Sequence, residues 1–138
     1  MILAIDVGNT NTVIGVFCGD RLCADYRVAT SREKTADEWA MLITQLLEFS
    51  NIPASEIAGI ILSSVVPPVI TVFEKMARKY FGCTIDVVGP GTKTGMAIKY
   101  ENPKEVGADR IVNAVAAYEL YGGPLVIVDF GTATTFCA

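Results

Sequence analysis

The chain contains 138 residues, of which 51% are hydrophobic, and fifteen Asp and Glu against eleven Lys and Arg give a formal charge of −4. It has no histidine, which excludes Ser-His-Asp and Cys-His nucleophiles and histidine-ligated zinc. The acidic balance argues against nucleic acid as a partner, because nucleic acid binds basic surfaces. The length matches one domain of ordinary size.

The amino end and the cysteines indicate a cytoplasmic protein. Residues 1–5 are apolar, but Asp6 follows them and no basic stretch precedes them, so they do not form a signal peptide. The most apolar stretch, residues 57–73, is interrupted by serine and proline, and a membrane span needs about 20 continuous apolar residues. The four cysteines form no Cys-x-x-Cys pair, and we expect all of them to be reduced thiols.

The first part of the chain predicts three antiparallel strands and a helix. Runs of apolar and β-branched residues, bounded by turn residues, predict strands over 2–6, 12–18 and 21–29. Thr35 and Glu38 have the spacing of a capping box, and apolar residues at helical spacing follow them.

The remainder alternates strands and helices. Residues 58–66 are almost continuously apolar, which is typical of a parallel strand covered on both faces. A helix whose apolar side runs from Val69 to Tyr80 should begin at the Pro67-Pro68 pair and end at Gly82. Further strands are expected over 83–88 and 125–129, the second of them buried, with a short extended piece over 97–100 and a helix over 107–121. This order predicts an α/β fold with a mixed sheet flanked by helices.

One motif occurs twice. Residues 6–12 read Asp-Val-Gly-Asn-Thr-Asn-Thr, and residues 129–135 read Asp-Phe-Gly-Thr-Ala-Thr-Thr, 123 residues later. Each copy follows an apolar strand, so a whole supersecondary unit is repeated and a duplicated domain is indicated. We expect residues 1–122 to form a first domain and residues 123–138 to be the start of a second one. The chain would then be one lobe and a stub of a two-domain protein.

The repeated turns have the chemistry of a phosphate site. Glycine lets backbone N–H groups approach an anion closely. Thr and Asn side chains add hydrogen-bond donors, and Asp6 at the strand end can hold a hydrated Mg²⁺. A plain hairpin turn is the alternative for either copy alone, and the matched pair favours the functional interpretation.

A second candidate site is Gly107-Ala108-Asp109-Arg110, which opens the last predicted helix. The N-terminus of a helix favours anions. Arg110 can bind a carboxylate or phosphate with two parallel hydrogen bonds, and Asp109 can accept a proton from a substrate hydroxyl. On composition alone the simpler alternative is favoured, in which Asp109 is a helix-start residue and Arg110 a surface charge.

Together these segments resemble the type III pantothenate kinase family, whose fold is the ribonuclease-H-like fold of actin-like ATPases and sugar kinases. The resemblance rests on residues 6–12, 107–110 and 129–135, with Tyr100 and Asn102-Pro103 shortly before the Gly-Ala-Asp-Arg segment. It implies transfer of the ATP γ-phosphoryl group to the primary hydroxyl of pantothenate, the first step of coenzyme A biosynthesis. It also implies a cytoplasmic homodimer that uses Mg²⁺ and a monovalent cation, K⁺ or NH₄⁺.

The resemblance also assigns residues. It implies that Asp109 is the catalytic base and that Asp129 binds the monovalent cation. It implies a pantothenate site at Tyr100, Gly107, Ala108, Asp109 and Arg110. It implies that ATP is bound by Asp6, Val7, Gly8, Asn9, Thr10, Asn11, Thr12, Val13 and Thr132. At Cys137 the family pattern often has an acidic residue, and we place no catalytic role there.

Two other functions stay open at the level of sequence. One is another kinase or phosphatase of the actin-like superfamily, acting on a sugar, acetate or polyphosphate; Tyr100 and residues 107–110 argue against it. The other is a non-catalytic regulatory relative. The 138 residues alone are expected to be incomplete for activity.

Overall fold

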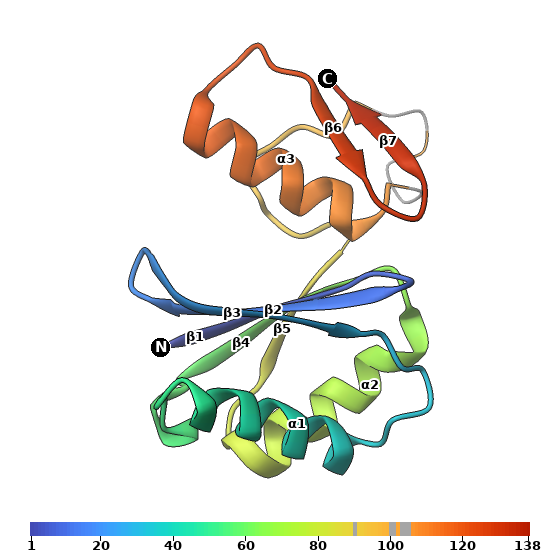
Figure 1. Cartoon of the computed structure of the whole chain (residues 1–138). Helices are drawn as coiled ribbons and strands as arrows, with labels where there is room; N and C mark the ends of the chain where they lie inside the picture. The colour runs from blue at the N-terminus through green and yellow to red at the C-terminus, as the bar shows by residue number, and fades with distance from the viewer. Residues whose placement is uncertain (90, 100–101, 103–105) are drawn as a thin grey trace. The chain divides into compact units, whose positions relative to one another are not determined.

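The computed structural model describes residues 1–89, 91–99, 102 and 106–138. The chain forms two compact units, an amino-terminal unit of residues 1–87 and a carboxyl-terminal unit of residues 88–138. In chain order the elements (Figure 1) are β1 (Ile2–Val7), β2 (Asn11–Cys18), β3 (Arg21–Ala29), α1 (Ala36–Phe49), η1 (Ala54–Glu56), β4 (Gly59–Ser64), α2 (Pro67–Met76), η2 (Ala77–Phe81), β5 (Ile85–Val88), α3 (Ala108–Tyr121), β6 (Ile127–Phe130) and β7 (Thr134–Cys137).

The amino-terminal unit is built on a five-stranded sheet with the order β3-β2-β1-β4-β5. Strand β2 runs antiparallel to β1 and β3, whereas β4 runs parallel to β1. Helices α1 and α2 both lie against one face of this sheet (Figure 1). The expected α/β fold, a mixed sheet packed against helices, is therefore confirmed.

The core lies between that face and the two helices. Alternate residues of β1 are buried, as are Trp39, Ala40, Ile43 and Leu47 of α1. Trp39 of α1 and Phe73 of α2 are fully buried, and their ring centroids are 4.9 Å apart. The aromatic pair thus joins the two helices at the centre of the unit.

The predicted capping box is present at the start of α1. The backbone N–H of Thr35 donates to Glu38 Oε2 at 2.7 Å, and the backbone N–H of Glu38 donates to Thr35 Oγ1 at 3.3 Å. The hydrogen bonds from the Thr35 backbone and hydroxyl hold the pKa of Glu38 below its ordinary value. Two N–H groups at the helix start are thereby satisfied.

Two burial expectations are wrong. Ile61 of β4 is 40% exposed, because it lies on the sheet face opposite α1 and α2 and that face is not fully covered. Tyr80 is 44% exposed because the helix widens into a π-helical turn over Ala77–Phe81, which changes the direction of its side chains. The helix still ends at Gly82, as expected, and this glycine has a left-handed conformation with φ +65°.

The expectation of four reduced thiols is also wrong, because Cys18 and Cys23 form a disulfide. The pairing of β2 with β3 shifts between Val16 and Phe17, so Cys23 is an extra residue in β3. This bulge brings the two Cα atoms to 6.1 Å, within the range that a disulfide spans. Cys83 and Cys137 remain thiols.

The carboxyl-terminal unit contains α3 and the antiparallel hairpin β6–β7. The strand expected over 125–129 forms as β6, but Phe130 is 82% exposed and Val128 is 40% exposed, so it is not buried as predicted. A two-stranded hairpin buries little of its own surface. No strand forms over 97–99, and Tyr100 lies outside the described residues. Within the described part of the chain, every helix is too short or too polar to cross a bilayer.

Candidate active site

The first group of predicted site residues surrounds the turn between β1 and β2. The backbone N–H of Gly8 donates to the Asn11 carbonyl at 3.0 Å and closes the turn. Thr30, just after β3, makes three contacts with this turn. Its hydroxyl donates to the Gly8 carbonyl at 2.8 Å and lies 2.9 Å from Thr12 Oγ1. Its backbone N–H donates to the Thr10 carbonyl at 2.9 Å. The turn is therefore tied to the end of β3 by hydrogen bonds of Thr30.

The residues of this turn differ in their exposure to solvent. Asn9, Thr10 and Asn11 are exposed, whereas Val7 and Thr12 are fully buried. The side chains that can meet a ligand are thus the exposed amides and hydroxyl at the tip. Arg32 Nη2 donates to Asn9 Oδ1 at 3.4 Å and brings a positive charge to the tip, which favours an anion.

The residues of the turn fit a nucleotide phosphate with a hydrated Mg²⁺. A Cβ on Gly8 would lie 3.0 Å from the Asn11 carbonyl oxygen, so only glycine leaves this backbone undisturbed. Asp6 supplies one carboxylate, and no cluster of three or more Cys, Asp or Glu occurs among the described residues. A single carboxylate suits Mg²⁺, which keeps several waters and takes further oxygens from phosphate.

The second group begins at the start of α3. Gly107 precedes the helix, and its carbonyl accepts from the N–H groups of Arg110 at 3.1 Å and Ile111 at 3.3 Å. Asp109 is the acidic residue of the first turn, and its Oδ1 accepts from the Arg110 N–H at 2.8 Å. The carboxylate is thereby oriented at the positive end of the helix.

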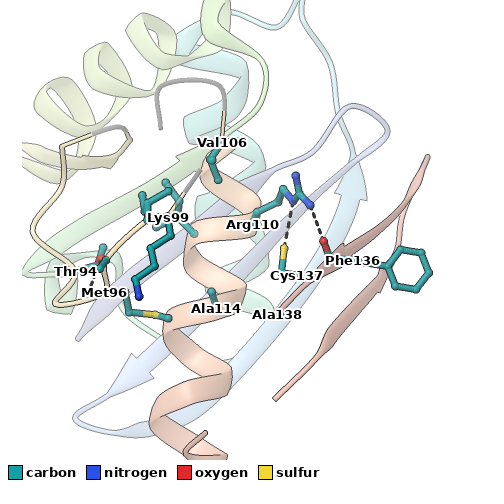
Figure 2. Close-up of a pocket in the computed structure, with 12 residues that line it drawn as sticks. Thr94, Met96, Lys99, Val106, Arg110, Ala114, Phe136, Cys137 and Ala138 are labelled. Carbon is teal, nitrogen blue, oxygen red and sulfur yellow. Dashed lines mark hydrogen bonds between the residues drawn. The ribbon is translucent and has the colours of Figure 1, made fainter. Parts of the chain in front are cut away.

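Arg110 is held by β7 and borders a pocket within the carboxyl-terminal unit. Its Nε donates to Cys137 Sγ at 3.2 Å and its Nη2 to the Phe136 carbonyl at 2.6 Å (Figure 2). The pocket has a volume of about 310 Å³, and its walls are mainly apolar apart from Arg110, Lys99 and Thr94. Two cationic side chains in an apolar pocket favour a small organic anion.

Asp129 lies on β6 and is linked to α3. Asn113 Nδ2 donates to Asp129 Oδ2 at 3.3 Å. Asn113 is one turn along the helix from Asp109, so the two residues share a face of α3. Thr132 is exposed at the tip of the β6–β7 turn, where the Gly131 N–H donates to the Ala133 carbonyl at 3.2 Å.

The family model for type III pantothenate kinases matches residues 2–138. The chain belongs to this family. Over 137 residues it is 61% identical to the type III pantothenate kinase of Bacillus cytotoxicus, 59% to that of Halalkalibacterium halodurans and 60% to that of Geobacillus kaustophilus. Each alignment covers 99% of this chain and 52%, 54% and 53% of the relative. The chain therefore spans about half the length of the curated relatives it matches.

A solved structure is also similar. The ROK hexokinase of Thermus thermophilus aligns with a TM-score of 0.43 and 17% identity, over 62% of this chain and 34% of that one.

The predicted residues of the pantothenate kinase family fall into two groups, one in each unit. Asp6 and the other residues up to Val13 lie together at the β1–β2 turn. The carboxyl-terminal unit holds Gly107, Ala108, Asp109 and Arg110 at α3, with Asp129 and Thr132 on the adjoining hairpin. The assignments to individual ligands remain predictions.

Three residues near these groups were not found from the sequence. Thr30 and Arg32 reach the first turn only because β3 pairs with β2, and that pairing depends on the whole sheet. Asn113 follows Asp109 by four residues, so helical spacing could have placed it on the same face.

Proposed function

We propose that the complete natural protein transfers the γ-phosphoryl group of ATP to the primary hydroxyl of pantothenate, the first step of coenzyme A biosynthesis. Membership of the type III pantothenate kinase family carries this proposal, since the match extends from residue 2 to residue 138. The geometry adds a glycine turn suited to phosphate and an aspartate at a helix start beside a cationic pocket.

In this proposal the residues from Asp6 to Val13 bind the ATP phosphates, with Thr132 contributing from the second turn. The fixed turn and the exposed side chains of Asn9, Thr10 and Asn11 support the assignment. Asp6 would hold Mg²⁺ through water. When bound, Mg²⁺ neutralises charge that develops on the transferred phosphoryl group.

Asp109 is the proposed base. As the pantothenate hydroxyl oxygen forms its bond to the γ-phosphorus, the bond to the bridging oxygen of ADP breaks and Asp109 takes the hydroxyl proton. Arg110, Gly107, Ala108 and Tyr100 line the pantothenate site. The cationic pocket beside Arg110 suits pantothenate because that substrate carries a carboxylate.

Further features belong to the same proposal. Asp129 would hold K⁺ or NH₄⁺; its carboxylate, oriented by Asn113, has the oxygen ligands that such cations take. Residues 123–138 would begin a second domain that completes the cleft. The working enzyme would be a cytoplasmic homodimer.

A coupled assay of ADP release tests the proposal with the complete protein, Mg²⁺, K⁺ and a panel of pantothenate, sugars and acetate. Turnover only with pantothenate is the expected result. Preference for a sugar or acetate would identify another superfamily kinase instead. No turnover with any acceptor, despite ATP binding, would favour a regulatory relative.

A further inference from the structure

Ser63, at the end of β4, has a buried hydroxyl that the fold itself does not use. The residue is only 5% exposed, and its Oγ makes no hydrogen bond with any residue that the structure describes. Buried polar groups nearly always have a hydrogen-bond partner, because burying one without a partner is unfavourable. The rest of the strand before it is apolar, from Ile60 to Leu62. A hydroxyl here therefore calls for an explanation.

Ser63 lies next to the proposed phosphate site. Ser63 pairs in register with Asp6 of the parallel strand β1. Paired residues of neighbouring parallel strands lie on the same sheet face, and such strands are about 4.8 Å apart. Both residues are at the carboxyl ends of their strands, where open α/β sheets bind ligands. Ser63 is thus the neighbour of Asp6 on β4.

The adjacent serine provides an internal comparison. Ser64 Oγ accepts from the Val66 N–H at 3.0 Å and donates to the Val66 carbonyl at 3.2 Å. Its hydroxyl stabilises the segment that leads from β4 into α2, which is a structural role. Ser63 has no corresponding backbone contact among the described residues, although the two serines are consecutive.

We propose that the Ser63 hydroxyl hydrogen-bonds to the hydration shell of a divalent cation held beside Asp6, as a positioning residue for the metal–phosphate complex. This inference rests on the proposed function, because it assumes that Asp6 holds Mg²⁺ through water. A hydroxyl both donates and accepts, so it suits a water molecule of the shell. Mg²⁺ retains most of its waters in protein sites, and groups that orient such waters strongly affect metal affinity.

The test measures how much a divalent cation strengthens nucleotide binding, using Mn²⁺ as the probe. ADP binding to the complete natural protein is titrated calorimetrically with Mn²⁺ and again with EDTA. The ratio of the two dissociation constants reports the metal contribution. Because metal-free ADP is an internal control, a general structural defect leaves this ratio unchanged. Ser63→Ala is compared with the matched variant Ser64→Ala.

We expect Ser63→Ala to lower the ratio about tenfold, with metal-free ADP binding and thermal unfolding close to the wild type. Ser64→Ala should keep the wild-type ratio and unfold at a lower temperature. Ser63→Cys preserves the side-chain size and replaces Ser63→Ala if that variant does not fold.

The outcomes separate the two proposals. An unchanged ratio in the Ser63 variants would overturn the role of Ser63 and leave the kinase proposal standing. A wild-type ratio of one would also refute the Ser63 inference alone. If the wild type bound no ADP under either condition, the proposed ATP site would fail, and the inference with it.

Discussion

Asn113 Nδ2 lies 3.3 Å from Asp129 Oδ2, so a side chain of α3 holds a carboxylate of β6 in place. Asn113 and Asp109 share one face of that helix. The residue proposed as base and the residue proposed to bind a monovalent cation are therefore positioned by the same element.

Replacing Asn113 by Ala should impair the use of the monovalent cation. Without the amide, the Asp129 carboxylate is no longer oriented, and the K⁺ concentration for half-maximal activity should rise about tenfold. A K⁺ titration of steady-state turnover measures this. Glu119→Ala, in an exposed position farther along α3, is the control, and an equal shift in both variants would argue against the link.

Replacing Asp109 by Asn should reduce turnover at least about 100-fold, the usual contribution of a general base. ATP binding should remain within about twofold of the wild type, because the phosphate turn is untouched. Turnover assays test the expected loss of activity, and nucleotide titrations test the expected retention of ATP binding. Near-normal turnover in this variant would remove Asp109 from the role of base.

The two glycine turns should respond differently to alanine. A Cβ on Gly8 would lie 3.0 Å from the Asn11 carbonyl oxygen, whereas a Cβ on Gly131 would meet the Ala133 carbonyl oxygen at 3.6 Å, an ordinary contact. Gly8→Ala should therefore lower the unfolding midpoint more than Gly131→Ala. Equal midpoints in thermal unfolding would contradict the predicted difference.

The aromatic contact in the core should dominate the stability of the amino-terminal unit. Phe73 is fully buried against Trp39, and Phe73→Ala should cost about 3–5 kcal/mol in the free energy of unfolding. Phe49, which is 87% exposed, is the matched control, and Phe49→Ala should change stability by less than about 0.5 kcal/mol. Urea unfolding followed by circular dichroism compares the two.

The capping box should make stability depend on pH in acid. The bonds from Thr35 lower the pKa of Glu38 in the folded state below its ordinary value of 4.5. Their contribution is therefore complete above pH 4.5 and is lost as the pH falls through the folded-state pKa. Thr35→Ala should reduce the fall of the urea midpoint between pH 6 and pH 3. Alanine keeps the backbone N–H bond to Glu38 and removes only the bonds of the hydroxyl, so an identical fall in both proteins would show that the Thr35 hydroxyl makes no contribution.

The sequence predicted those parts of the site that depend on neighbouring residues. The turn after β1 follows from Gly8 and its polar neighbours, and the start of α3 follows from Gly107 and Asp109. Because these signals are local, the chain order of the other strands and helices was also predicted, whereas the extended piece expected over 97–100 does not form over residues 97–99.

What could not be predicted depends on how one strand aligns with another. Ser63 becomes the neighbour of Asp6 only through the parallel register of β1 and β4. The Cys18–Cys23 disulfide depends on a bulge in the pairing of β2 with β3. No periodicity within one segment encodes such a register.

Thr30 orders the first turn before any ligand is bound. Its hydrogen bonds to Gly8, Thr10 and Thr12 order the loop as the chain folds, so the nucleotide proposed to bind there would cost little further loop entropy. The ordering is supplied by the carboxyl end of β3, which lies at the edge of the sheet. A nucleotide bound at this turn, as proposed, would therefore also oppose the local opening of that edge strand, and hydrogen exchange along β3 should slow when the nucleotide is added.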